Sequence, residues 1–174
     1  FKSRKHIGSR PLSEVGGDET VVIFVDGSVT GNPGGVVGYG WHCVETGESG
    51  QGVAYQGGSS ATNNSAEWMA AAAALIYVLG QYYDVVDTVT IRSDSELLVN
   101  QLNGEWRVKH ANLKPIAAIV NLLIEELESR NMTTVAEWIP REENKVADAL
   151  SRQTVKALLK ERRQMTRREL EEHD

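Results

Sequence analysis

The pattern of hydrophobic and polar positions in the first half of the chain predicts three strands and then a helix. Residues 21–25 are continuously apolar and mostly β-branched, which is typical of a strand buried on both faces. This strand is expected to stop at Asp26, before a Gly-rich turn region. Two further strands, joined by a hairpin connection, are expected at residues 36–44 and 51–56. The Ala- and Leu-rich segment at residues 62–82 follows polar capping residues and predicts a long buried helix.

The second half of the chain alternates between strand and helix patterns. Strands are expected at residues 85–92 and 133–139. Helices are expected from residue 96 to about residue 103, at residues 113–130, and from about residue 142 into a charged tail. The helix at residues 113–130 has apolar residues at positions 116, 119, 120, 123, 124 and 127, which is the spacing of one apolar face. The resulting order, βββαβααβα, predicts an α/β fold in which helices flank a mixed five-stranded sheet.

Length and charge suggest one domain with two tails. The chain has 174 residues, and we expect a flexible basic arm at residues 1–18, a domain at residues 19–155 and a charged helical tail at residues 156–174. Residues 11–155 hold 8 basic and 19 acidic residues, and the whole chain has a net charge of −6. An acidic body repels phosphates, so this charge counts weakly against a nucleic-acid partner, although local sites and bound metal override such a field.

Several protein classes are disfavoured by composition. Cys43 is the single cysteine, so no internal disulfide forms and nothing argues for secretion. No apolar stretch approaches the roughly 20 residues that span a bilayer, and no cleavable signal pattern is present. We therefore expect a cytoplasmic monomer with no membrane partner.

Four carboxylates lie where predicted elements begin or end: Asp26, Glu67, Asp94 and Asp148. Each has a structural alternative. Asp26 with its Gly neighbour is a common turn pair, and Glu67 follows Asn64 at the spacing of a capping box. Asp94 could cap the next helix, and Asp148 could pair with Lys145 or Arg152 along its own helix.

The expected topology favours a shared site for these acids. If the strands that precede Asp26 and Asp94 are parallel neighbours, the two carboxylates lie side by side at one sheet edge, where ligands collect in such sheets. Glu67 and Asp148, near the starts of their helices, can reach the same edge. Four carboxylates this close repel one another, and two divalent cations about 4 Å apart would resolve the repulsion. Oxygen ligands are those that Mg²⁺ prefers.

Four motifs, in order, resemble those of type 1 ribonuclease H: DGSVTGNPG, TNNSAEW, SDSELLVNQLNGEWRVKHANLKP and WIPREENKVADALSR. The resemblance covers roughly residues 20–152, and the predicted element order is also that family's. It implies an Asp-Glu-Asp-Asp site of Asp26, Glu67, Asp94 and Asp148 that holds two Mg²⁺ or Mn²⁺ ions, with Asp26 bridging them. It also implies hydrolysis of the RNA strand of RNA–DNA hybrids to 5′-phosphate and 3′-hydroxyl ends.

The resemblance suggests substrate contacts as well. Asn32 and Asn63 are candidates for contact with RNA, and Thr62 and Asn64 for contact with a DNA phosphate. Helix capping is the alternative for both Asn63 and Asn64. Glycines allow close backbone approach to the RNA, among them Gly27 and Gly31.

The chain lacks the extra basic helix that some relatives use to grip DNA. The segment at residues 104–112 instead offers Trp106 and Lys109 for packing on a nucleic-acid backbone. Anchoring of this segment to the core is the preferred interpretation of Trp106.

Many relatives carry a His in the loop before the last Asp, but residues 133–148 contain none. Arg141 occupies that loop and is a candidate for a catalytic or phosphate-binding role. Its alternative is a solvated loop charge.

Three functions are consistent with these observations. The first is a free-standing ribonuclease directed at hybrids. The second is the ribonuclease H domain of a reverse-transcribing element, an expectation that a start at Phe1 rather than Met keeps open. The third is a non-catalytic nucleic-acid-binding module, which the presence of all four acids argues against.

Overall fold

The computed structural model describes residues 20–31, 35–56, 58–81 and 86–172. The flexible basic arm predicted at residues 1–18, and Asn32, lie outside the described residues. The elements follow the predicted order, with one additional short 3-10 helix, η2. They are β1 (Thr20–Val29), β2 (Val36–Cys43), β3 (Ser49–Gln56), α1 (Asn63–Gln81), β4 (Thr88–Ser93), α2 (Glu96–Leu102), α3 (Lys114–Ser129), β5 (Thr133–Trp138), η2 (Arg141–Glu143) and α4 (Lys145–Glu171).

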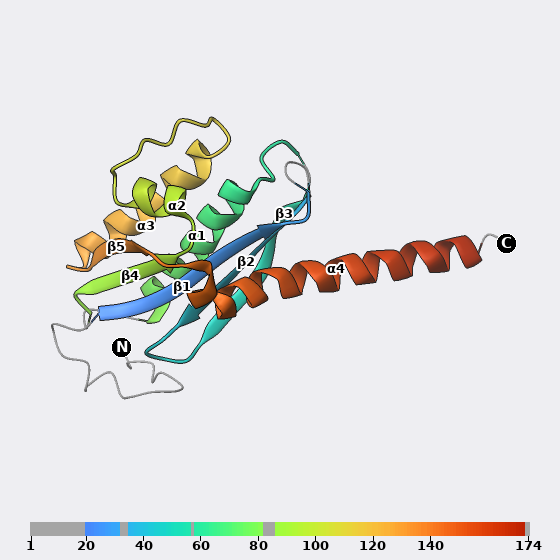
Figure 1. Cartoon of the computed structure of the whole chain (residues 1–174), viewed down its shortest axis with the longest axis horizontal. Coiled ribbons are helices and arrows are strands. Elements are labelled where there is room, and N and C mark those ends of the chain that lie inside the picture. Colours follow the sequence, from blue (N-terminus) through green and yellow to red (C-terminus); the bar gives the residue numbers. More distant parts are fainter. Residues whose placement is uncertain (1–19, 32–34, 57, 82–85, 173–174) are drawn as a thin grey trace.

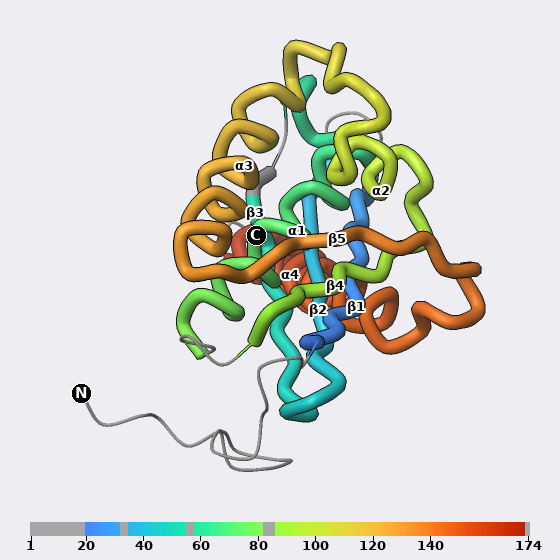
Figure 2. The backbone as a smooth tube through the Cα atoms, turned by 90° about the vertical axis from the view of Figure 1, so that its left-hand side faces the viewer, coloured from blue at the N-terminus to red at the C-terminus, as the bar shows by residue number. Residues whose placement is uncertain are grey.

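The five strands form one mixed sheet, as predicted, and their order in it is β3-β2-β1-β4-β5 (Figures 1 and 2). β1, β2 and β3 are antiparallel neighbours, whereas β4 runs parallel to both β1 and β5. The parallel pairs are the ones that need helical crossovers, and α1, α2 and α3 supply them. The last β1–β4 register pair is Phe24 with Arg92. This pair determines which residues of the two chain segments lie side by side after it.

Helices approach the β1–β2 pair closely from both faces. A Cβ at Gly40 of β2 would lie 2.6 Å from the carbonyl oxygen of Ala147 in α4. A Cβ at Gly27 of β1 would overlap the backbone of Ala66 in α1. α3 packs beside α1, and among the described residues α4 is the helix that covers the opposite face of the sheet. Both glycines are therefore explained by close helix–sheet packing.

The core lies between the sheet and α1. Ile23 and Ile91 from the two central parallel strands are fully buried, and so is Leu75 of α1. Small side chains such as Ala71 and Ala74 are also fully buried, which lets α1 lie close to the strands. The apolar stretch within residues 62–82 thus forms the buried helix that its composition predicts.

Three local predictions are wrong. β1 does not stop at Asp26 but continues to Val29, because this extension pairs with β2. The last helix begins at Lys145 rather than near residue 142, because η2 intervenes. Ile119, expected on the apolar face of α3, is 50% exposed.

α4 is continuous from Lys145 to Glu171, so no break separates the domain from the charged tail. Its second half projects away from the sheet (Figure 1). Among the described residues, no helix is both long enough and apolar enough to cross a membrane.

Candidate active site

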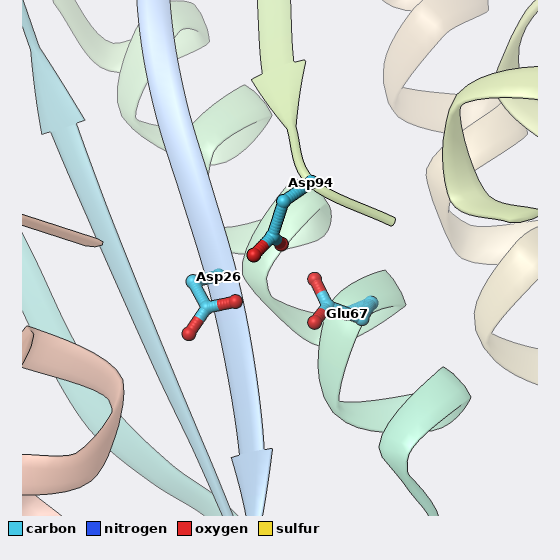
Figure 3. Close-up of side chains that lie close together, drawn as sticks. All are labelled: Asp26, Glu67 and Asp94. Atoms are coloured by element: carbon cyan, nitrogen blue, oxygen red, sulfur yellow. The ribbon is translucent and has the colours of Figure 1, made fainter. Parts of the chain in front are cut away.

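Three of the four predicted carboxylates meet at the centre of the sheet. Asp26, Glu67 and Asp94 each offer one oxygen, and these oxygens all lie within 4.8 Å of one another. The side chains come from β1, α1 and the end of β4, and they point toward one another (Figure 3). Three distant segments of the sequence thus build one acidic cluster.

Strand register brings Asp26 and Asp94 together. Because Phe24 is level with Arg92 in the parallel pair, Asp26 and Asp94 are level two residues further on. Asp94 is not the cap of α2, as one alternative had it. That position is taken by Ser95, whose Oγ accepts a hydrogen bond of 3.2 Å from the backbone N–H of Leu98.

Glu67 lies in the second turn of α1, and it is not part of the helix cap. The reciprocal cap is made by Thr62 and Ser65: the N–H of Ser65 donates to Thr62 Oγ1 at 3.2 Å, and the N–H of Thr62 donates to Ser65 Oγ at 3.0 Å. The capping box expected between Asn64 and Glu67 is therefore wrong. Glu67 reaches β1 because Gly27 has no side chain to hold α1 away.

Asp148 lies near the cluster without joining it. It is in the first turn of α4 and lines the same cleft, but its Oδ1 accepts a hydrogen bond of 2.9 Å from Nε of Arg152. The ion pair is partly exposed, so it contributes little to stability and breaks easily. Of the two partners expected for Asp148, Arg152 is the one it contacts, and not Lys145. Its place in a four-carboxylate site stays a prediction.

Two buried polar residues of α4 and its start hold β1 in place, and the sequence analysis did not single them out. Ser151 Oγ donates to Asp26 Oδ2 at 2.9 Å, and Asn144 Nδ2 donates to the carbonyl of Val25 at 2.8 Å. Ser151 is three residues after Asp148, so helical spacing could have placed its hydroxyl on the face of the site. No sequence signal marks Asn144.

The pKa values of Asp26 and Glu67 are raised, so both carboxyls favour the protonated form when no cation is bound. Burial, followed by the charges of Asp94 and Asp148, raises the pKa of Asp26 to about 7, against the opposing effect of the Ser151 hydroxyl. Burial and then the charges of Asp26 and Asp94 raise the pKa of Glu67 well above its ordinary value. Positive charge is what this site lacks.

A divalent cation fits the residues present. Glu67 Oε2 is buried and has no hydrogen-bond partner among the residues that the structure describes. A buried, unpartnered carboxylate oxygen needs an explanation, and a metal ligand is one that satisfies it. The donor set is oxygen only, which suits Mg²⁺ or Mn²⁺.

The acids open into a cleft of about 590 Å³. Asn63 and Arg141, both predicted site residues, line it together with Gly27. Arg141 is exposed on η2, the short helix that precedes α4. Other residues of the lining were not predicted as site residues, among them Thr30, Arg152 and Lys156.

Other predicted contacts lie elsewhere. Among the described residues, the cleft lining does not include Gly31, Thr62, Asn64, Trp106 or Lys109. Trp106 is 46% exposed, so its expected role as a core anchor is wrong, and Val108 packs against the core instead. The substrate contacts of these residues stay predictions.

Comparison with known proteins places this site in a family. Residues 24–154 match the family described as reverse transcriptase-like. A bifunctional protein of Mycobacterium tuberculosis is 34% identical over 145 residues, which cover 79% of this chain and 36% of that protein. A ribonuclease HI of Halobacterium salinarum is 32% identical over 135 residues, covering 76% of this chain and 62% of that protein. The chain thus spans about a third of the mycobacterial relative.

The fold is shared with solved structures. A crystal structure of LC11 ribonuclease H1 in complex with an RNA/DNA hybrid matches with a TM-score of 0.70 at 30% identity. The match covers 80% of this chain and 99% of that one. The mixed sheet with flanking helices is thus the fold of that enzyme.

Proposed function

The chain belongs to the ribonuclease H-like family, and on that premise we propose that it is a metal-dependent endonuclease that hydrolyses the RNA strand of RNA–DNA hybrids. The products would carry 5′-phosphate and 3′-hydroxyl ends. The observation that carries this proposal is the convergence of Asp26, Glu67 and Asp94 within 4.8 Å, with one buried oxygen of Glu67 unpartnered among the described residues.

Asp26, Glu67 and Asp94, with Asp148 nearby, are the residues that would hold two divalent cations. When bound, two such ions supply an activated water and neutralise charge on the leaving 3′ oxygen. The residues of the chain prepare that site. Ser151 orients Asp26 through its hydroxyl, and Asp148 would join the ligand set if it released Arg152.

Arg141 is the cationic side chain that we assign to the scissile phosphate or the leaving group. It lines the cleft from η2, and Asp148 lines the same cleft. A guanidinium there would stabilise charge that develops as the P–O bond breaks. In this role it replaces the His that many relatives carry.

Hybrid selectivity requires 2′-hydroxyls to be read on one strand only. Asn63 lines the cleft and offers an amide for this purpose, and Asn32 is its proposed partner by family resemblance. Thr62 and Asn64 are proposed to contact the DNA phosphates. That a similar enzyme was crystallised with an RNA/DNA hybrid supports this substrate class.

The test is a cleavage assay on end-labelled RNA–DNA hybrid, duplex RNA and duplex DNA, each with Mg²⁺, Mn²⁺ or chelator. We expect cleavage of the RNA strand of the hybrid only, none with chelator, and none with Asp26→Asn. Arg141→Ala should slow cleavage at least about tenfold, equivalent to about 1.4 kcal/mol of transition-state stabilisation. Near-normal turnover by Asp26→Asn would show the metal assignment to be wrong.

The same assay separates the alternatives. A non-catalytic binding module would bind the hybrid and leave it intact under every metal condition. A ribonuclease H domain of a reverse-transcribing element would cleave like the free-standing enzyme, so its distinction depends on the parent gene and stays a prediction.

A further inference from the structure

A row of basic side chains, which the acidic cluster does not use, runs along α4 from the cleft into the exposed half of the helix. Five residues spaced by three or four positions share one face of the helix, because such spacing returns to the same side of an α-helix. We call this face the basic ridge, and it consists of Arg152, Lys156, Lys160, Arg163 and Arg167.

Acidic residues of α4 are largely kept off this face. At about 100° per residue, Glu161 and Glu169 are turned about 140° away from the centre of the ridge. Glu171 flanks the ridge and pairs with Arg167 at 2.9 Å, but both side chains are largely exposed, so the pair is weak. The ridge therefore presents a net positive row on an otherwise acidic protein.

The ridge continues directly from the catalytic cleft. Arg152 and Lys156 line the cleft that holds Asp26 and Glu67. Lys156 and Leu159 also line a shallow hollow that runs on along the helix to Arg167. A ligand held in the cleft thus meets the ridge where it leaves the cleft.

Helix stability does not explain the ridge. Like charges three or four residues apart repel one another in a helix, and every residue from Lys160 to Glu172 is exposed, so no core packing offsets this. An isolated helix gains most from alternating Glu and Lys at this spacing. A bound polyanion would turn the repulsion into attraction.

We propose that the basic ridge is a nucleic-acid-binding surface that grips phosphates of the hybrid beyond the catalytic cleft. The inference rests on the proposed function, since it assumes that the cleft holds a hybrid. From Arg152 to Arg167 the ridge is about 22 Å long at about 1.5 Å per residue, which spans about six or seven base pairs at about 3.4 Å each. The partner is a phosphate backbone read without sequence preference, because the ridge offers charge and no base-reading geometry.

The chain provides a matched pair of variants for the test. Arg163→Gln with Arg167→Gln removes two ridge arginines, whereas Arg162→Gln with Arg168→Gln removes two arginines from other faces of the same exposed helix. Both variants lose the same charge, and circular dichroism checks that both retain the helix. Binding is measured with chelator present, by anisotropy of a labelled RNA–DNA hybrid of about 20 base pairs, long enough to cover cleft and ridge.

We expect the ridge variant to bind more weakly and the control variant to bind like the wild type. Two lost phosphate contacts reduce the slope of log K against log salt by about 1.8, so the deficit shrinks about tenfold from about 50 to about 200 mM salt. In the cleavage assay with Mg²⁺, the ridge variant should show a raised KM with little change in kcat.

The outcomes separate this inference from the proposed function. Wild-type affinity and salt slope in the ridge variant, or an equal loss in both variants, would overturn the ridge as a specific surface while cleavage of the hybrid stands. Ridge-dependent binding without any cleavage would keep the ridge and refute the nuclease. Binding to anionic vesicles is measured with the same variants. If the ridge variant loses binding to the vesicles but not to the hybrid, the assignment of the ridge to nucleic acid is overturned.

Discussion

Asp26 is buried beside other acidic side chains, so its ionised form is unfavourable when no metal is bound. The side chain is only 5% exposed, with Asp94 and Glu67 beside it. Its raised pKa, about 7, records the free energy that ionisation there requires. The same burial and negative charge favour binding of a cation, because a cation offsets the repulsion between the carboxylates.

Asp26→Asn should stabilise the metal-free protein at alkaline pH. The folded pKa of Asp26 is above its ordinary value of 3.8, so its stabilising contribution is complete below about pH 4 and is lost as pH rises through about 7. At about pH 8 the wild type carries an uncompensated buried charge, and the Asn variant does not. We expect a higher midpoint of thermal unfolding for the variant at that pH with chelator.

Near pH 4 the advantage should disappear, because Asp26 is then largely neutral in the folded state and close to half neutral in the unfolded state. Thermal melts followed by circular dichroism at the two pH values give the comparison. A variant less stable than the wild type at the alkaline pH would mean that the Ser151 hydrogen bond outweighs the charge burial.

Residue identities were easier to predict than residue geometry. The four acids stand out because each lies at an element boundary and three of them have Gly, Asn or Ser neighbours, which is a recognisable pattern. Ser151 and Asn144 do not, since their importance comes from contacts with β1, which is far away along the chain. Similarly, the sequence could not show that Thr62 and Ser65 form the cap of α1, so that Glu67 takes no part in capping.

At the scale of elements, periodicity was a good guide to type and a poorer guide to ends. Residues 21–25 were identified as a strand by their β-branched run, but the strand's continuation to Val29 depends on pairing with β2. The exposure of Trp106 was mispredicted because a large aromatic residue is usually buried. Tertiary contacts decided both cases.

The spacing between α4 and β2 is an element-level feature open to test. Gly40→Ala would place a Cβ 2.6 Å from the Ala147 carbonyl oxygen and 2.7 Å from Leu150 Cβ, so α4 must shift. We expect a loss of about 1–3 kcal/mol in unfolding free energy, as for overpacked cores, measured by urea denaturation.

A matched glycine provides the control. A Cβ added at Gly80, in α1, would meet no heavy atom of the described residues within 4 Å beyond its own stretch of helix. Gly80→Ala should therefore stabilise the protein by about 0.5–1 kcal/mol, because Ala has the higher helix propensity. Equal stability of the wild type and Gly40→Ala would mean that α4 does not pack against β2 as tightly as the distances indicate.

At the scale of the whole molecule, charge is divided between an acidic body and a basic helix. The net charge of −6 supplied only a weak argument against nucleic acid, and the structure shows why an overall value says little. The acids that matter lie inside the cleft, while Arg152 and Lys156 lie on its wall. A linear count cannot reveal which face of α4 the basic residues share with the site.

Metal binding at the acidic cluster should couple to the stability of the entire fold. Asp26, Glu67 and Asp94 belong to three elements that meet only in the folded state, so a cation that binds them stabilises that state by mass action. At a free Mg²⁺ concentration about 100 times its dissociation constant the gain is about 2.7 kcal/mol, or about 5–10 °C in Tm for a chain of this size.

Because raised pKa values make protons compete with the metal, the gain in stability on Mg²⁺ binding should be larger at about pH 8 than at about pH 6. Differential scanning calorimetry with Mg²⁺ or chelator measures it, and Asp26→Asn, which lacks one carboxylate of the cluster, should lose most of it. An equal Mg²⁺ response in that variant would locate the stabilising ion away from the cluster.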